Sequence, residues 1–424
     1  MPVSSMHAVS DDAPLLHDLM PWAVRPLRIG RGWPMAPEPA CLRARWALLT
    51  AAPDDAARGA LLHASRARGL RTPVAQLPGH RTPTTALARE DGPCPEPMRV
   101  QHGAFDRQWL IPDHRLIDVA RPELWRVADD RQVFVVEQAH LPEVREPALS
   151  FSALLPDGRS PAGRPGWIRP LFRRPGGRDP NLAPGLTGWL AARLGTPVAP
   201  EDVLAWIAAA ARPGPAGCTV PLPEGPEVWR DGLALGARSL WLHTGGERAA
   251  DPEGGREEGR PRLPGGSRPY VRSPLPAVPR PGELAYDAEE GALRIGEGLV
   301  APVSPGAWEL TAGGVGVLEQ WYERRADPGS PGTLEALRPA TWTRAVTSEL
   351  LELISVLTLL SELREELAAF AERLAHVGRP GAGPRDGAGG LRGSGVLPVP
   401  AARRRPASVL EHHEEGPEGQ FTLV

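Results

Sequence analysis

The chain has 424 residues, which is enough for two or three domains and a sizeable core. All 48 basic residues are arginine, so a phosphate-binding loop of the GxxxxGK[ST] type and nucleases that need a catalytic lysine are excluded. A net charge of −3 argues against a general nucleic-acid binder, unless the arginines gather on one face.

Cysteine usage and hydropathy predict a reduced, cytoplasmic protein. Cys41, Cys94 and Cys218 are far apart and odd in number, which fits neither a disulfide framework nor a zinc knuckle. The N-terminus lacks the apolar segment of a signal peptide. The most apolar stretch, residues 350–360, is too short and too interrupted to cross a membrane, so we expect no membrane association.

The first half of the chain predicts short elements of both kinds. Residues 1–95 read as a loop-rich N-terminal extension, because prolines recur too often for long helices. Two short helices are predicted in it, over residues 39–49 and 54–67. Strands are predicted at 133–136, 149–155 and 168–172, and helices at 184–194, 199–211 and 225–243.

The second half begins with an exposed loop at 245–268, which has no apolar periodicity. Strands are predicted at 283–287, 292–296 and 308–311, and a helix at 315–325. A long amphipathic helix is predicted within 334–377, with an apolar stripe of Leu350, Leu353, Ile354, Leu357, Leu360 and Leu363. That stripe could face the core or a partner. Residues 377–424 read as a disordered tail, in which His412 and His413 are solvated and bind no metal.

These elements predict an α+β fold of mixed helices and short strands that ends in a long amphipathic helix. We expect three parts: the N-terminal extension at 1–95, a central domain at 96–376 and the tail.

An ordered series of motif blocks, which begins at Phe105-Asp106-Arg107 and ends at Arg324-Arg325, resembles the C-terminal specificity (target-recognition) domain of type ISP restriction-modification enzymes. The first block matches at Phe105, Asp106, Arg107 and Trp109, and again in the run from Arg121 to Trp125. The Tyr-Arg-Pro that opens this block in the family is replaced by residues 102–104, His-Gly-Ala. The most specific block contains Gly313, Gly314 and Trp321 and ends in two arginines, at 324 and 325.

Weaker blocks lie between these two. Pro170-Leu171-Phe172, Asn181-Leu182-Ala183-Pro184, Val220-Pro221-Leu222-Pro223 and Leu240-Trp241-Leu242-His243 resemble family segments in the same order. Residues 19–48 are also similar to actinobacterial proteins grouped with this family. The resemblance implies a target-recognition-like fold, in which we expect Phe105, Asp106, Trp109, Trp125, Asn181, Gly313, Gly314 and Trp321 to have structural roles.

The chain lacks the motifs that would support chemistry of its own. No [DN]PP[YFW] loop of an amino-methyltransferase occurs, and the glycines at 313–316 lack the acidic ribose partner of a dinucleotide-binding loop. No GxSxG or HExxH motif is present. We therefore expect no cofactor, no metal and no catalytic residue, and no catalytic activity of the chain alone.

Recognition of duplex DNA is the function that the resemblance implies. Arginine suits it, because its guanidinium group can bond guanine bidentately or neutralise phosphates. The candidate contacts are Arg107, Arg115, Arg121, Arg126, Arg169, Arg173, Arg174, Arg268, Tyr270 and Arg272. The alternative for each arginine is a surface ion pair.

The chain would then be the specificity component of a type ISP-like system, with a separate methyltransferase and nuclease-translocase subunit as partner. A second hypothesis is a protein-interaction or regulatory module that has lost DNA binding. A third is an S-adenosylmethionine-dependent DNA methyltransferase.

Overall fold

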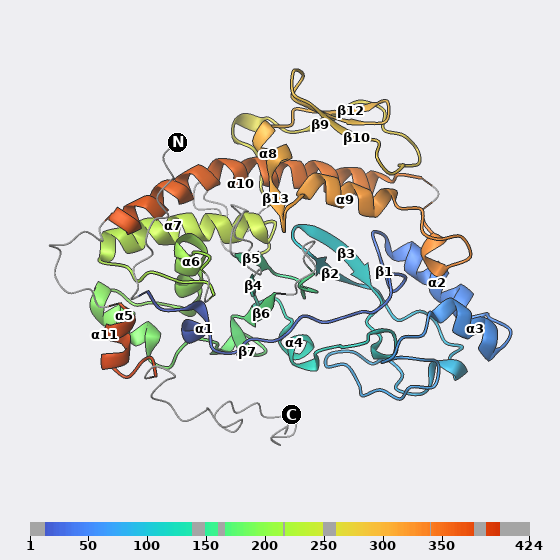
Figure 1. Ribbon diagram of the computed structural model, residues 1–424, viewed down its shortest axis with the longest axis horizontal. Helices are drawn as coiled ribbons and strands as arrows, with labels where there is room; N and C mark the ends of the chain where they lie inside the picture. The colour runs from blue at the N-terminus through green and yellow to red at the C-terminus, as the bar shows by residue number, and fades with distance from the viewer. Residues whose placement is uncertain are drawn as a thin grey trace, which may run out of the picture.

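The computed structural model describes residues 13–137, 149–159, 166–214, 217–248, 260–339, 341–376 and 387–398. Helices and small antiparallel sheets alternate along the chain, and the longest helix runs across the upper part of the molecule, beneath one of the sheets (Figure 1). This arrangement confirms the predicted α+β class with a long C-terminal helix. The helices are α1 (Leu16–Leu19), α2 (Pro39–Thr50), α3 (Asp55–Leu62), α4 (Pro122–Val127), α5 (Leu186–Leu194), α6 (Pro200–Ala210), α7 (Pro226–His243), α8 (Pro305–Glu309), α9 (Val317–Ala326), α10 (Arg344–His376) and α11 (Ala388–Gly393).

Two three-stranded sheets occupy the centre of the chain. One has the order β1-β3-β2 and the other β5-β4-β6, with β1 (Met35–Ala36), β2 (Met98–His102), β3 (Asp106–Leu110), β4 (Phe134–Glu137), β5 (Leu149–Ser152) and β6 (Trp167–Pro170). A two-stranded hairpin of β7 (Phe172–Arg174) and β8 (Arg178–Pro180) follows. Because β1 pairs with β3, the N-terminal region contributes a strand to a sheet of the central region.

The second half of the chain adds two more antiparallel units. A four-stranded sheet has the order β10-β11-β12-β9, with β9 (Tyr270–Ser273), β10 (Leu284–Asp287), β11 (Ala292–Ile295) and β12 (Gly298–Ala301). A small hairpin joins β13 (Thr311–Ala312) to β14 (Val315–Gly316). Its two turn residues, Gly313 and Gly314, have φ of 63° and 79°. Such a turn requires positive φ at both positions, which explains the double glycine.

Helix α10 unites two of the hydrophobic cores. Its predicted stripe from Leu350 to Leu363 is buried and belongs to the core that includes the four-stranded sheet, α8 and α9. Further along α10, Phe370 is buried in the core formed by α5, α6, α7 and β5. The stripe therefore faces the protein interior and not a partner.

Helices α6 and α7 approach closely because α7 carries glycine at the contact. A Cβ atom at Gly236 would lie 1.7 Å from the carbonyl oxygen of Ala205. A Cβ atom at Gly232 would lie 2.4 Å from the ring of Trp206. Only glycine fits a contact of this kind, so the cost of glycine inside a helix is offset by the packing.

Several predicted elements differ in extent from the structure. The expected strand at 308–311 is wrong in large part, because Ser304 accepts the N–H of Ala307 and Pro305 opens the helix α8. Helix α3 ends at Leu62 and not at residue 67, since His63 adopts the left-handed conformation that ends a helix. Helix α9 begins two residues later than predicted because residues 315–316 form β14.

The predicted loop and tail fall partly outside the described residues. Residues 249–259 of the loop and most of the tail, including His412 and His413, lie there. Within the tail, α11 buries Ala388 and Leu391 in the core that contains Phe370. In the part of the chain that is described, no helix could cross a membrane and no cluster of side chains could hold a metal ion. The three-part division of the chain stays a prediction.

We expect Gly236→Ala to destabilise the fold by roughly 3 kcal/mol or more, because the added methyl group meets a backbone carbonyl that cannot rotate away. Urea unfolding measures the change. The matched control is Gly188→Ala on α5, where nothing lies within 4 Å of the added atom. The free energy of unfolding of this control should rise by about 1 kcal/mol, because alanine favours a helix more than glycine does. Equal effects of both changes would contradict the tight α6–α7 contact.

Candidate nucleic-acid interface

The two most specific motif blocks meet in a buried ion-pair network. Asp106 on β3 is 1% exposed, and its carboxylate accepts hydrogen bonds from Arg324 Nη1 at 2.9 Å and Arg325 Nη1 at 3.0 Å, both on α9. Arg325 also pairs with Glu349 on α10 at 3.3 Å. Burial alone would raise the pKa of Asp106, but the charges of Arg325 and Arg324 outweigh it and lower that pKa to about 2.

Other motif residues hold the backbone around this network. The side chain of Asn181 is fully buried, donates to the carbonyl groups of Trp22 and Pro170, and accepts the N–H of Trp22. Trp125 packs in the core and donates to the carbonyl of Ala120. The rings of the two remaining motif tryptophans lie against arginines, Trp109 under Arg99 and Trp321 under Arg325.

We expect Asp106→Asn to lower the free energy of unfolding by roughly 3–5 kcal/mol, because it leaves two arginines near a neutral amide in a dry site. Chemical denaturation at neutral pH measures the loss. The control is Asp327→Asn, since Asp327 is exposed at the end of the same helix. A loss below about 1 kcal/mol for D106N, the scale of an exposed pair, would show that the network does not hold α9 on β3.

Three of the predicted DNA contacts are engaged in ion pairs with carboxylates of the protein, and two of these, Arg115 and Arg169, are buried. Arg115 has a side chain that is 1% exposed and pairs with Asp113 at 2.6 Å and Glu90 at 2.7 Å. Arg169 pairs with Glu137 at 3.0 Å and donates to the carbonyl of Met20 at 2.6 Å. Arg107 pairs with Glu247 and donates to the carbonyl of Thr244. The carboxylates that hold these arginines lie far from them in sequence in most cases, so the sequence alone did not reveal the pairing.

The other predicted contacts are at least partly exposed and fall into two groups. Helix α4 packs against β7, which brings the first group together: Arg121, Arg126, Arg173 and Arg174. The second group lies on and just before β9, in the sheet above α10 in Figure 1: Arg268, Tyr270 and Arg272. Tyr270 is 50% exposed and has the guanidinium of Arg272 over its ring at 6.0 Å. The structure therefore separates the predicted contacts into two places.

A cleft that the sequence analysis did not identify gathers more arginines than either group. It has a volume of about 1340 Å³, and we call it the arginine cleft. Its acidic lining residues are Asp157, Asp327 and Glu335. Its arginines are Arg25, Arg28, Arg31, Arg45, Arg121, Arg159, Arg324 and Arg338. Eight arginines and three carboxylates therefore line the cleft, and two of the arginines pair with the carboxylates of Asp118 and Asp106 behind it, in a chain whose net charge is −3.

Six of these eight arginines have no acidic partner among the described residues; the two that have one are Arg31 and Arg324, which pairs with Asp106. Arg45, Arg324 and Arg338 donate to backbone carbonyl groups of the cleft walls, and Arg31 pairs with Asp118. In the part of the chain that the structure covers, Arg25, Arg28, Arg121 and Arg159 have no carboxylate within ion-pairing distance. Only Arg121 of these four was a predicted contact. The available signal was the three-residue spacing of Arg25, Arg28 and Arg31.

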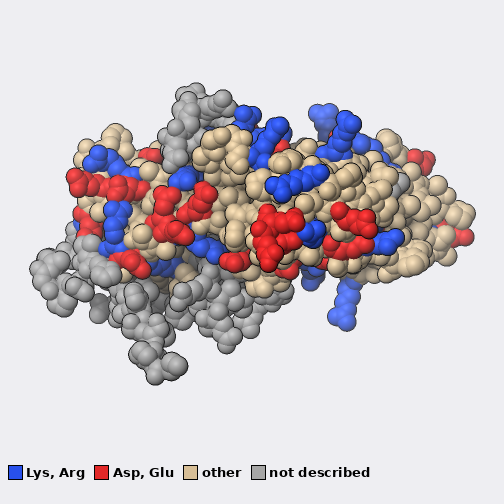
Figure 2. Space-filling model, turned by 90° about the horizontal axis from the view of Figure 1, so that it is seen from above, with Lys and Arg blue, Asp and Glu red and all other residues tan. Residues whose placement is uncertain are grey.

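The face seen from above carries a different pattern of charge. Over α7, α10 and the β9–β12 sheet, arginines and acidic side chains are interspersed (Figure 2). Ion pairs link these elements, including Arg238 with Glu366 at 2.7 Å and Arg373 with Asp231 at 3.0 Å. Such pairing neutralises the surface locally, so α7 and α10 offer no continuous positive track for a polyanion.

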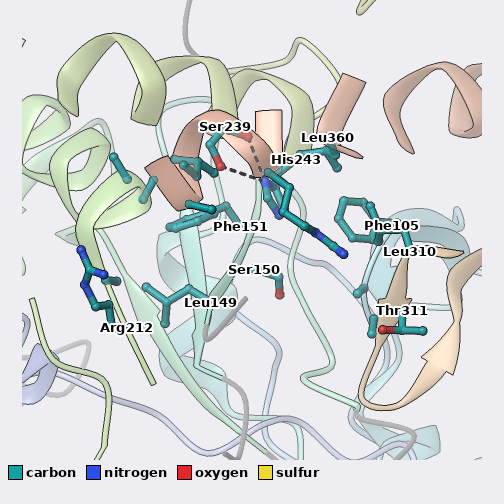
Figure 3. A pocket seen from close by; sticks show the side chains of 18 of the residues that line it. Phe105, Leu149, Ser150, Phe151, Arg212, Ser239, His243, Leu310, Thr311 and Leu360 are labelled. Carbon is teal, nitrogen blue, oxygen red and sulfur yellow. Dashed lines mark hydrogen bonds between the residues drawn. The ribbon is translucent and has the colours of Figure 1, made fainter. Parts of the chain in front are cut away.

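A second, apolar pocket lies between the core that contains α6 and α7 and the core that contains the α10 stripe (Figure 3). Its volume is about 280 Å³. His243 of α7 stands in its wall, with its ring stacked on Phe105 at 5.1 Å and edge-on to Phe151 at 5.4 Å. Its Nδ1 lies 2.9 Å from the carbonyl oxygen of Ser239, so this nitrogen carries the proton. Burial lowers the pKa of His243 to about 4.

We expect His243 to make the protein sensitive to acid. The unfolded chain takes up a proton near pH 6.5, whereas the folded chain resists it until about pH 4. Stability is therefore present above pH 6.5 and is lost as pH falls towards 4. At pH 5 the wild type should have lost about 2 kcal/mol more than His243→Gln, relative to pH 7.5, in urea unfolding. Parallel losses in the two proteins would contradict this role.

The chain is similar to known proteins over most of its length. Residues 18–353 match the family model described as the type ISP C-terminal specificity domain. A search of curated proteins finds no match. One similar solved structure is a cryo-EM structure of a DrdV–DNA complex, with 15% identity and a TM-score of 0.55 over 83% of this chain and 36% of that chain.

Another is the ATP-dependent type ISP restriction-modification enzyme LlaBIII bound to DNA. It has 12% identity and a TM-score of 0.53 over 84% of this chain and 23% of that chain. At these identities the likeness shows a shared fold. The chain covers about a third or less of the length of these two proteins.

Proposed function

The chain belongs to the family of type ISP C-terminal specificity domains, and we propose that it recognises a specific sequence in duplex DNA within a type ISP restriction-modification system. Catalysis would be supplied by methyltransferase and nuclease-translocase parts outside these 424 residues. Both similar structures described above are complexes with DNA, which supports the proposal.

The observation that carries the proposal is the charge of the arginine cleft. A net charge of −3 would count against DNA binding if the charges were evenly spread. Eight arginines and only three carboxylates instead line the cleft, while carboxylates elsewhere pair with Arg115, Arg169 and the arginines of α7 and α10. A local positive field of this kind attracts DNA whatever the net charge of the chain.

Sequence specificity requires side chains that reach base edges. Arg268 and Arg272 are suitable, because both are exposed and neither has a carboxylate within ion-pairing distance in the described residues. An arginine can donate two parallel hydrogen bonds to O6 and N7 of guanine in the major groove. Tyr270, beside Arg272, offers a hydroxyl and a ring for further contact. We exclude Arg115 and Arg169 from this set because their guanidinium groups are buried in internal ion pairs.

The second hypothesis, a protein-interaction module without DNA binding, has one observation in its favour. The mixed charges over α7 and α10 in Figure 2 resemble an ordinary solvated or protein-binding face. The third hypothesis, methyl transfer by this chain, has less support because Gly313 and Gly314 form the turn of the β13–β14 hairpin.

The experiment is a selection of the purified protein against a randomised duplex library at about 150 mM salt, near physiological ionic strength. We expect enrichment of a short motif. The variant R173A/R174A should bind more weakly and show a flatter dependence of affinity on salt, because phosphate contacts release counterions.

The control removes two exposed arginines from α7 and α10, as R230A/R364A, and should bind like the wild type. Binding without any enriched motif would reject sequence recognition by the chain alone, and no binding at low salt would favour the protein-interaction hypothesis. Unchanged binding by R173A/R174A would remove the β7 arginines from the interface.

A further inference from the structure

We propose that the arginine cleft holds the sugar–phosphate backbone of one DNA strand and that Arg31, at its floor, anchors a phosphate group. The inference rests on the proposed function and gives this cleft a role of its own. The cleft sets affinity and register, while base reading takes place elsewhere.

One wall of the cleft is an extended segment fixed at both ends. Val24 exchanges backbone hydrogen bonds with Ile168 of β6 at 2.8 and 2.9 Å, and Arg28 does the same with Val119 at 2.9 Å. Between these points Pro26 and Leu27 are buried, whereas Arg25 and Arg28 are exposed. An extended chain advances about 3.3 Å per residue, so the two arginines stand roughly 10 Å apart on a rigid support.

Two further arginines reach the cleft from backbone that is equally well fixed. Arg121 follows two residues after Val119 and has φ of 55° at the start of α4, with its Nε buried and without a hydrogen-bond partner in the described residues. Arg159 follows a turn in which the carboxylate of Asp157 accepts the N–H groups of Gly103 at 2.9 Å and Arg159 at 3.0 Å. Neither arginine has a carboxylate to neutralise it among the residues described.

The strongest indication of a bound ligand comes from the unsatisfied donors of Arg31. Its side chain is 1% exposed, and one of its three nitrogens, Nη2, bonds to Asp118 Oδ1 and Ser65 Oγ at 3.2 Å each. Its Nε and Nη1 are buried and have no partner in the described part of the chain. Buried donors without acceptors are costly and rare in folded proteins. A phosphate oxygen that reaches Arg31 would satisfy one of these donors, since Nε and Nη1 lie on different edges of the guanidinium group, and guanidinium groups suit that ligand.

The concave shape of the cleft favours contact with the sugar–phosphate backbone of DNA over contact with its bases. A duplex presents its phosphates on convex ridges, whereas base edges lie at the floor of grooves and are read by elements that protrude. A concave cleft with its key arginine at the floor can receive a ridge but cannot reach into a groove. Glu335, whose Oε1 accepts the N–H of Trp33, supplies internal counter-charge to Arg31 and Arg45 and keeps the floor from being uniformly positive.

The test compares R28A/R121A with the wild type and with R230A/R364A, which removes the same charge outside the cleft. Affinity for a labelled duplex of mixed sequence is measured over a range of salt concentrations. We expect R28A/R121A to lose roughly 10- to 100-fold in affinity, with the slope of log K against log salt smaller by about 2, or about 0.9 per phosphate contact. The same motif should be enriched from the library as with the wild type, because no base contact has been removed.

Three results would overturn the inference: unchanged affinity and slope in R28A/R121A, an equal loss in R230A/R364A, or a changed motif, which would place base reading in the cleft. Failure of the proposed function differs from these, since the wild type itself would then bind no duplex or enrich no motif from the library. Arg31→Lys tests the anchor, because it keeps a positive charge but removes the Nε and Nη1 donors. It should weaken binding to the mixed duplex while thermal unfolding shows an intact fold, and undiminished binding would remove Arg31 from the proposal.

Discussion

The buried carboxylate of Asp106 is the constraint on which the described structure depends. It neutralises Arg324 and Arg325 in a site from which water is excluded. Removal of either the carboxylate or the arginines would leave a buried charge without a counter-charge, which destabilises the fold. Three elements distant in the sequence, β3, α9 and α10, are thereby held together. Replacing the whole network with apolar residues could preserve stability. It would not preserve the direction of Arg324, which also donates to the carbonyl of His102 and lines the cleft.

The same constraint explains why residues before 95 matter to the candidate interface. Strand β1 pairs with β3 at Trp109 and Leu110, on the strand that carries Asp106, and the N–H of Trp33 is bonded to Glu335 beyond α9. The guanidinium of Arg45 donates hydrogen bonds to the carbonyl groups of both Trp33 and Leu337 and so links the two segments. The N-terminal segment thus forms one wall of the arginine cleft, and α9 with the residues that follow it forms another. The family model agrees, since its match begins at residue 18.

Sequence reasoning succeeded where a local pattern determines the structure. The stripe from Leu350 to Leu363 predicted an amphipathic helix, and the run of proline, acidic and apolar residues at 200–210 predicted a helix start. It failed at 308–311, where a capping serine outweighed a short β-rich pattern. It also could not find the arginine cleft. That site depends on the pairing of Arg28 with Val119 and of Val24 with Ile168, and no local signal specifies contacts over such separations.

Net charge was the strongest argument from sequence against a DNA-binding role, and the structure shows why it carries little weight. Arg115, Arg169 and Arg325 each hold carboxylates in the interior, where their charges cancel within a few ångströms. Pairs such as Arg238–Glu366 cancel on the outside. Charges beyond about 8 Å are largely screened at physiological ionic strength, so a polyanion responds to the local surface and not to the sum over the chain. At the arginine cleft that local surface is positive, because Arg25, Arg28 and Arg159 stand there without acidic partners in the part of the chain described.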